Sequence, residues 1–380
     1  MTGGPCNLPK RCVIVADDLT GACDSALQFR RHGARALVHL NWKTAIRESA
    51  DIDAFSTDSR NLNPFQSSSR IRELAQNVRE FFDTSYLIFK KIDSLLRGSP
   101  GTEIVTAMDA FGCDLGIVTP SFPEMGRTVV DGQLHVDGDE SWSPIDVIAL
   151  LRSQGLESCS HVTPKTIADA LGRGARYLSV ESASNEDLRV ITSEAIKCGR
   201  KILWAGSAGL AGALAELLFS PETRAVFHMP GKRPVLFCMG SQHPVTAAQI
   251  KNLKSKRPVC LSDAKSATGV EVASALAYGQ HVILQVDVGE AKYRQIRDLV
   301  CGVAELMEAV VVSGGDTLAL FCYAMQCGSI EIEDQIVAGF PWGVFRGGLL
   351  DGLTIATKSG AFGAPDDLIK AMDFFTCSKN

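Results

Sequence analysis

Polar side chains follow four apolar runs in the N-terminal half of the chain, at the points where buried strands would end. The runs CVIVA, DAFST, YLIFK and LGIVT are each followed by acids, bases or hydroxyl groups. The residues that stand out there are Asp17, Asp18, Arg60, Lys91, Asp93, Ser94, Arg97, Gly98 and Arg127. Guanidinium and ammonium groups bind carboxylates, and aspartates accept hydrogen bonds from sugar hydroxyls. If the strands are neighbours in one sheet, this mixture predicts a pocket for a small polyhydroxylated acid.

The aspartates of this set have both chemical and structural interpretations. Asp17, Asp18 or Asp93 could accept a proton from a substrate hydroxyl as a general base. One acid of the Asp17–Asp18 pair could instead cap the helix that we expect to begin directly after it. Asp93 and Arg97 have the i,i+4 spacing of a surface ion pair, but the following GSPG segment favours an extended loop. We expect at least one acid of the adjacent pair to contact substrate.

Three glycine turns in the C-terminal half also follow strand-like runs, within CMGSQHPVT, VVVSGGDTLAL and TKSGAFGAPD. Their candidate ligand-binding residues are Ser241, Gly314, Gly315, Asp316, Thr317, Ser359 and Gly360. A glycine turn from a strand into a helix exposes backbone N–H groups that favour phosphate, although many such turns are only tight connections. Neither GxxxxGK[ST] nor GxGxxG occurs, which disfavours a P-loop and a simple dinucleotide site. His243, beside the first turn, is interpreted as a polar contact rather than a base.

The elements that would position these residues alternate between strands and helices. From residue 12 to about 225, short apolar runs alternate with amphipathic segments, which is typical of βαβ units around a mostly parallel sheet. The proline- and glycine-containing segment HMPGKRP interrupts this pattern, and a second series of alternating apolar runs and amphipathic segments begins after it. We predict an α/β protein with two domains, residues 1–229 and 230–380, each a mostly parallel sheet flanked by helices.

Composition narrows the classes of partner. The chain of 380 residues is 46% hydrophobic and 21% charged, with a net charge of −5, which disfavours nucleic acid as a partner. No apolar run is long enough to cross a membrane, and we expect a cytoplasmic protein. The 12 cysteines form no CxxC pair and no Cys/His cluster with zinc spacing, so we expect reduced thiols and identify no metal ligands. The sequence leaves a homo-oligomer open.

The motifs together resemble the four-carbon acid sugar kinase family. The resemblance rests on VADDLTGACDSA, STDSRN, KKIDSLLRGSPGTE, TPSFPEMGRTVVDGQLHV, AGSAGLAGALA, SGGDT and KSGAFG, which run in the family's order from about residue 12 to residue 366. It implies an ATP-dependent kinase of threonate, erythronate or 3-oxo-tetronate that phosphorylates the terminal hydroxyl at C4. Leu95 and Ser99 stand where the family usually has threonine and asparagine, which changes the hydrogen-bonding capacity beside the expected sugar-acid pocket.

The resemblance also implies which ligand each of the two domains binds. The first would hold the acid sugar and the second ATP, with the substrate/ATP cleft between them. Nucleotide contacts would come from Ser241, from residues 314–317 and from Gly360, with Mg²⁺ bridging the phosphates. Two other functions remain open from the residues themselves. One is an NAD-dependent sugar-acid dehydrogenase, and the other is a sensor that binds sugar acid and nucleotide without catalysis.

Overall fold

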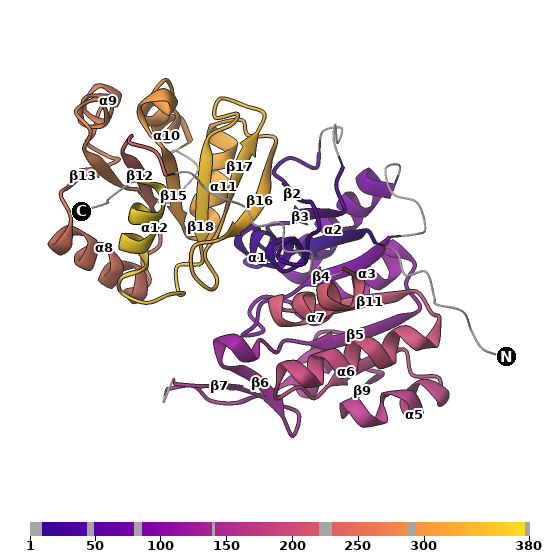
Figure 1. Ribbon diagram of the computed structural model, residues 1–380. Coiled ribbons are helices and arrows are strands. Elements are labelled where there is room, and N and C mark those ends of the chain that lie inside the picture. Colours follow the sequence, from indigo (N-terminus) through magenta and orange to yellow (C-terminus); the bar gives the residue numbers. More distant parts are fainter. Residues whose placement is uncertain are drawn as a thin grey trace. The chain divides into compact units, whose positions relative to one another are not determined.

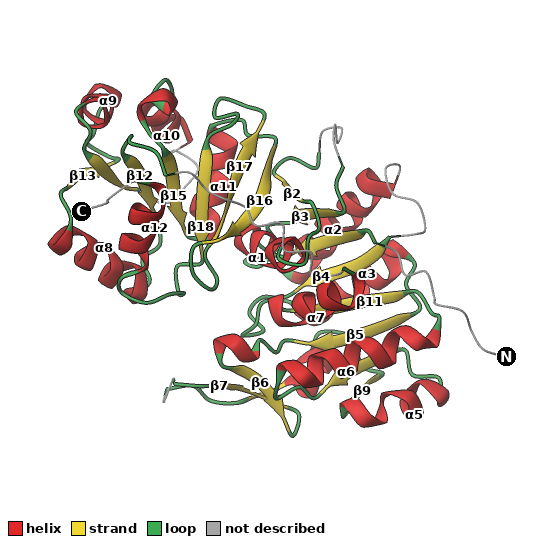
Figure 2. Ribbon diagram, viewed as in Figure 1, coloured by secondary structure: helices red, strands yellow, loops and turns green. Residues whose placement is uncertain are grey.

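The computed structural model describes residues 10–43, 49–79, 86–138, 141–219, 230–286 and 293–376 (Figure 1). The chain divides into two compact units. Unit 1 comprises residues 1–36 and 42–223, and unit 2 comprises residues 37–41 and 224–380. Both units are α/β, with strands forming a sheet and helices covering it (Figure 2).

Unit 1 is built around seven parallel strands in the order β3-β1-β4-β11-β5-β10-β9. Their bounds are β1 Cys12–Ala16, β3 Ile52–Ser56, β4 Leu87–Lys91, β5 Leu115–Thr119, β9 Cys159–Val162, β10 Tyr177–Val180 and β11 Ile202–Gly206. Helices cover both faces of such a sheet, so most of its strands are buried along their length and rich in apolar residues rather than alternating. The runs CVIVA, DAFST, YLIFK, LGIVT, RYLSV and KILWA predict six of these strands, and all six are present, whereas β9 is additional.

Seven helices cover the sheet of unit 1. They are α1 Leu19–Arg30, α2 Pro64–Arg79, α3 Pro100–Phe111, α4 Val147–Ser153, α5 Ile167–Gly172, α6 Asn185–Ala195 and α7 Ala208–Leu218, among the described residues. Helices α2, α3 and α4 pack together, as do α1, α7 and α6. Single-turn 3₁₀ segments occur at η1 Pro123–Met125, η2 Pro164–Thr166 and η3 Ile196–Cys198. A Cβ at Gly209 would lie 2.5 Å from the Ser121 carbonyl oxygen, so glycine allows α7 to approach the sheet closely.

A small antiparallel sheet accompanies the parallel one in unit 1. It consists of β6 Arg127–Val130, β7 Gln133–Val136 and β8 Ile145–Asp146. The run QLHV, in which His135 is interpreted as a strand residue, predicts the middle strand of this sheet only. The flanking strands are short and half-buried, so their apolar pattern is weak.

Unit 2 contains a second sheet with the order β13-β14-β12-β15-β18-β17-β16. The bounds are β12 Val235–Met239, β13 Val259–Asp263, β14 His281–Gln285, β15 Ala309–Ser313, β16 Ser329–Gln335, β17 Pro341–Arg346 and β18 Thr354–Lys358. The first five strands in this order are parallel, and β17 and β16 continue the sheet as antiparallel strands. The described helices are α8 Pro244–Lys256, α9 Gly269–Ala277, α10 Tyr293–Val300, α11 Gly315–Ala324 and α12 Asp367–Phe375, with a 3₁₀ turn η5 at Ala304–Leu306.

The predicted division at residue 229/230 adjoins residues 220–229, which lie outside the described residues. One segment of the predicted first domain belongs to unit 2 instead. Strand β2, Ala36–His39, is followed by Leu40, whose N–H donates to the Gly328 carbonyl at 3.0 Å, and residues 37–41 belong to unit 2. The run ALVH is buried along its whole length, so its pattern predicts a strand without specifying which sheet takes it.

The described cysteines carry free thiols, and most of them are buried. Among the helices of the described ranges, none is both long and apolar enough to span a membrane.

Candidate functional site

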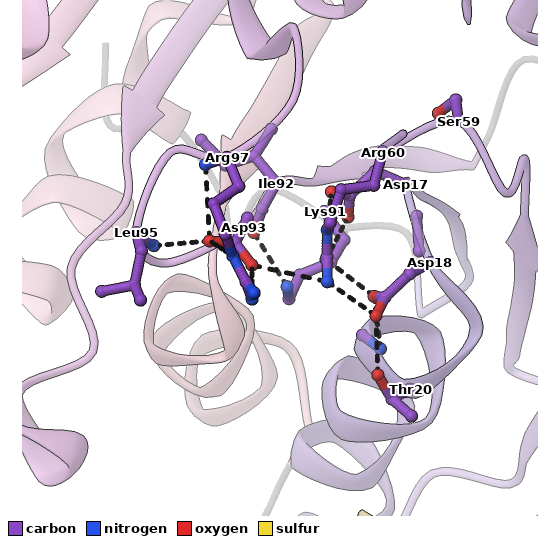
Figure 3. A network of polar contacts seen from close by, with 12 residues as sticks. Asp17, Asp18, Thr20, Ser59, Arg60, Lys91, Ile92, Asp93, Leu95 and Arg97 are labelled. Atoms are coloured by element: carbon purple, nitrogen blue, oxygen red, sulfur yellow. Dashed lines mark hydrogen bonds and ion pairs between the residues drawn. The ribbon is translucent and has the colours of Figure 1, made fainter. Parts of the chain in front are cut away.

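Three of the four predicted strand ends lie side by side in unit 1. Strand β1 pairs with β3 on one side and with β4 on the other, in registers that align Ala16 with Ser56 and with Lys91. The residues that follow these three strands therefore meet at one edge of the sheet, as expected for the carboxyl ends of parallel strands. Figure 3 shows the resulting cluster of acids and bases.

Arg60 lies at the centre of this cluster and contacts three aspartates (Figure 3). Its Nε is 2.7 Å from Asp17 Oδ2 and its Nη2 is 2.9 Å from Asp17 Oδ1. The same guanidinium donates to both oxygens of Asp18, at 2.7 and 2.8 Å, and Nη1 lies 3.5 Å from Asp93 Oδ2. Bidentate, charge-assisted bonds of this kind fix the carboxylates in position.

The arginine and lysine side chains of the cluster keep the buried acids Asp17 and Asp93 ionised. Burial by itself raises the pKa of Asp17, but Arg60 and then Lys91 and Lys90 outweigh it, and the pKa lies below its ordinary value. Burial likewise raises the pKa of Asp93, and the hydrogen bond from Arg97 with the charge of Arg60 brings it well below the ordinary range. Both groups are carboxylates at neutral pH and can accept hydrogen bonds from hydroxyl groups.

Asp18 combines the two roles considered for it. One carboxylate oxygen accepts a hydrogen bond from the Gly21 N–H at 2.8 Å and caps helix α1, while the other accepts from Thr20 Oγ1 at 2.7 Å. The same side chain is bound by Arg60. Capping therefore orients Asp18 towards the cluster instead of removing it from the cluster.

Asp93 and Arg97 form the i,i+4 ion pair that was the alternative interpretation of their spacing, and they form it within a loop, which the sequence favoured over a helix. Arg97 Nη2 is 2.6 Å from Asp93 Oδ2, and the side chain of Arg97 is 52% exposed, so its remaining donors are accessible. Ser94 is buried beside them. Gly98 has φ +81°, and a Cβ there would lie 2.9 Å from the Arg60 carbonyl oxygen, so glycine is required where this loop meets the Arg60 backbone.

Lys91 and Lys90 end strand β4 with different partners. Lys91 Nζ donates to the Ile92 carbonyl at 2.8 Å. Lys90 is fully buried and forms an ion pair of 2.8 Å with Glu103 of α3, which also accepts a hydrogen bond from Ser59 at 2.6 Å. Sequence reasoning missed the Lys90–Glu103 pair. The signal was the first lysine of YLIFKK, Lys90, which stands inside a buried strand and so needed a buried partner.

Arg127 comes from the fourth strand end, which is not adjacent to the other three. Strand β11 lies between β4 and β5. The guanidinium of Arg127 donates to the Met125 carbonyl, and the charges of Asp93 and Arg97 both act on it. Burial lowers the pKa of Arg127, and Asp93 opposes this effect. The structure thus keeps Arg127 within electrostatic range of the cluster.

The three glycine turns of unit 2 also meet at one sheet edge, because β12, β15 and β18 are neighbouring parallel strands. A Cβ at Gly240 would collide with Thr317 Oγ1, and one at Gly360 would collide with Ser241 Oγ. Gly314 has φ +102° and caps α11 without a side chain. The three turns therefore pack closely against one another, and glycine is needed at Gly240 and Gly360 for this packing.

Lys358 is a further basic group at this edge, which sequence reasoning missed although it precedes the SG of the third turn. Its side chain is buried and donates to the Ser359 carbonyl at 2.9 Å, with Ser313 Oγ at 3.4 Å. Burial lowers the pKa of Lys358 to about 8, and Asp367 opposes the shift. His243 Nδ1 accepts a hydrogen bond from the Val245 N–H at 3.2 Å, so it is the polar contact predicted.

Family models match both halves of the chain. A model of a sugar-binding N-terminal domain matches residues 12–214, and a model of a nucleotide-binding C-terminal domain matches residues 286–368. A D-threonate kinase from Bordetella bronchiseptica is 27% identical over 399 residues, covering 94% of this chain and 96% of the relative. The chain belongs to the four-carbon acid sugar kinase family.

A second curated relative agrees with this assignment, and a solved structure shares the fold. A D-erythronate kinase from Heliobacterium modesticaldum is 25% identical over 430 residues, covering 95% of this chain and 96% of that kinase. A Haemophilus influenzae protein of known structure has the same fold, with a TM-score of 0.72, 20% identity and coverage of 96% of this chain and 100% of that one. The predictions of an α/β fold and of a phosphotransferase are confirmed.

Proposed function

We propose that this four-carbon acid sugar kinase uses ATP to phosphorylate threonate, erythronate or an oxo-tetronate on its terminal C4 hydroxyl. The observation that carries the proposal is the cluster of Arg60 with Asp17, Asp18 and Asp93 at one sheet edge of the sugar-binding unit. It combines acceptors for hydroxyl groups with nearby cations for a carboxylate.

The cations of the cluster have different roles in this proposal. Four donor contacts of Arg60 are already directed at Asp17 and Asp18, so it acts on the substrate mainly by orienting these acceptors. Arg97, half-exposed, and Lys91 then bind the substrate carboxylate, with Arg127 adding positive charge. Ser94 and the backbone at Gly98 border the same loop and complete the sugar-acid site.

The residues of unit 2 hold the nucleotide in this proposal. ATP supplies the phosphoryl group, and its Mg²⁺ neutralises charge on the phosphates. Backbone amides of Gly314, Gly315 and Gly360 would bind the phosphates, together with the hydroxyl groups of Ser241 and Thr317. The remaining candidates of the same turns are Asp316 and Ser359. No cluster of three or more His, Cys, Asp or Glu side chains in the described part is arranged to hold a metal ion.

Ligand-dependent melting combined with product detection tests this proposal against the two other functions. We expect Mg-ATP to raise the melting temperature and NAD to leave it unchanged, because a ligand that binds only the folded protein stabilises it. We also expect ADP to appear when a four-carbon sugar acid is added. Stabilisation by NAD alone would favour a dehydrogenase. Stabilisation by ATP without ADP release on any of the acids would favour a sensor.

A further inference from the structure

Asp24 is an acid near the cluster whose carboxylate forms no ion pair with an arginine among the described residues. It lies in α1, six residues after Asp18, and its side chain is partly exposed. Its Oδ1 atom is buried and has no hydrogen-bond partner among the described residues. A buried carboxylate oxygen without a donor is costly, so its presence beside a polar site points to a ligand that supplies the missing hydrogen.

The surroundings of Asp24 connect it with the cluster. Three charged groups act on it, namely Lys91 at the end of β4, Asp18 before α1 and Glu124 of η1. A Cβ at Gly21, one turn before Asp24, would lie 3.1 Å from Lys91 Nζ. The glycine therefore lets the lysine approach the first turns of α1, where both Asp18 and Asp24 are located.

The electrostatic balance at Asp24 differs from that of its neighbours. Burial raises the pKa of Asp24 to about 6, Lys91 lowers it, and the negative charges of Asp18 and Glu124 raise it further. The pKa values of Asp17 and Asp93 are instead lowered by arginine. A carboxylate that titrates close to neutral pH is a better proton acceptor than one stabilised as an anion by a guanidinium.

We propose that Asp24 is the general base of the reaction, in place of Asp17, Asp18 or Asp93. This inference rests on the proposed function. The Asp24 carboxylate takes the proton of the acceptor hydroxyl as the hydroxyl oxygen forms its bond to the γ-phosphorus of ATP. The bond between that phosphorus and the oxygen bridging to the β-phosphate breaks, ADP leaves with the bonding electrons, and Asp24 then releases the proton to solvent. Asp17, Asp18 and Asp93 hold the other hydroxyl groups.

Asp24→Asn provides the main test, because it keeps the shape of the side chain and removes its basicity. We expect kcat to fall by about 10²-fold or more, while KM for the sugar acid stays within about threefold. In the wild-type protein, kcat/KM should decrease as pH falls through about 6, because Asp24 becomes protonated. The residual activity of Asp24→Asn should lack this acid limb.

Glu124→Gln is a matched control, since Glu124 is an exposed acid that acts on Asp24 only through its charge. We expect it to keep the plateau value of kcat and to move the acid limb to lower pH, because loss of a negative charge lowers the pKa of Asp24. If Asp24→Asn does not fold, this displacement tests the same assignment, and an acid limb that does not move overturns it.

The outcomes distinguish a failure of the Asp24 assignment from a failure of the proposed kinase function. A kcat within about threefold of wild type in folded Asp24→Asn overturns the role of Asp24 and leaves the kinase proposal standing. A wild-type protein that releases no ADP with any four-carbon sugar acid overturns the proposed function and this role with it.

Discussion

Arg60 holds the carboxylate of Asp17 by both oxygens, with Nε 2.7 Å from Oδ2 and Nη2 2.9 Å from Oδ1. The Asp17 side chain is only 4% exposed and that of Arg60 only 15% exposed. Two residues 43 positions apart in the chain are thus joined where strands β1 and β3 end. This contact couples the stability of unit 1 to the geometry of the sugar-acid site.

Replacing Arg60 should destabilise the protein strongly. Arg60→Ala leaves the buried Asp17 carboxylate without its main partner, and we expect the free energy of unfolding to fall by about 3–5 kcal/mol. Arg60→Lys should lower the free energy of unfolding by less than Arg60→Ala, because the ammonium keeps a positive charge beside the acids. It should still lower it, because an ammonium cannot bind both acids bidentately. Urea denaturation measures both losses. Arg189→Ala, which removes surface pairs with Glu186 and Glu216, serves as the control and should cost about 1 kcal/mol or less. Equal losses in Arg60→Ala and this control would contradict the prediction.

The buried pair of Lys90 and Glu103 should show strong coupling. Lys90→Met leaves Glu103 buried with only its hydrogen bond from Ser59, and we expect a loss of about 3–5 kcal/mol in unfolding free energy. Removing both charges in Lys90→Met/Glu103→Leu should restore much of this loss, because no buried charge then remains unpaired. A double-mutant cycle measured by urea denaturation checks this. Additive effects of the two single substitutions would be evidence against the coupling.

Gly360 should be necessary for nucleotide binding. Gly360→Ala places a methyl group against Ser241 Oγ, which would force the first and third glycine turns apart. We expect the rise in melting temperature produced by Mg-ATP to be lost or greatly reduced. Gly172→Ala is the matched control, because a Cβ there meets nothing within 4 Å. The same ATP-dependent rise in both variants would show that the packing of these turns does not matter for the nucleotide.

Lys358 should make ATP binding sensitive to pH. Burial lowers the pKa of Lys358 to about 8, so its ammonium is charged below this pH and becomes neutral above it. If the ammonium faces the phosphates, the Kd for ATP should rise as pH increases from about 7 to about 9. Calorimetric titration at several pH values measures this change. Lys358→Met should bind more weakly at pH 7 and should show little further change, whereas an unaltered pH dependence in this variant would assign the effect to another group.

The sequence predicted the strand ends well because their signal is local. The runs that became β1, β3 and β4 are mostly apolar, and charged residues stand at or just after their ends, where parallel strands bring them together. The insertion of β11 between β4 and β5 depends on long-range pairing, which no local pattern contains. The placement of residues 37–41 in unit 2 has the same cause.

Two of the side chains that sequence reasoning missed, Asp24 and Lys90, lie in a helix and inside a strand. Asp24 is in the middle of α1, where an acid is ordinarily a surface residue, and only the fold brings Lys91 and Glu124 near it. Lys90 is inside a buried strand, and its partner Glu103 is 13 positions further along the chain in α3. Pairings of this kind follow from packing between elements, which becomes visible only in the structure.

The most direct test of the central claim is ADP release from Mg-ATP in the presence of D- and L-threonate, D- and L-erythronate and their oxo-tetronates. We predict turnover with at least one of these acids, and its loss in Arg97→Ala, because the half-exposed guanidinium of Arg97 binds the substrate carboxylate. We also predict that the product carries its phosphate group on C4. If no acid of this panel releases ADP from a folded protein that Mg-ATP stabilises, the assignment of a four-carbon sugar acid as substrate is contradicted.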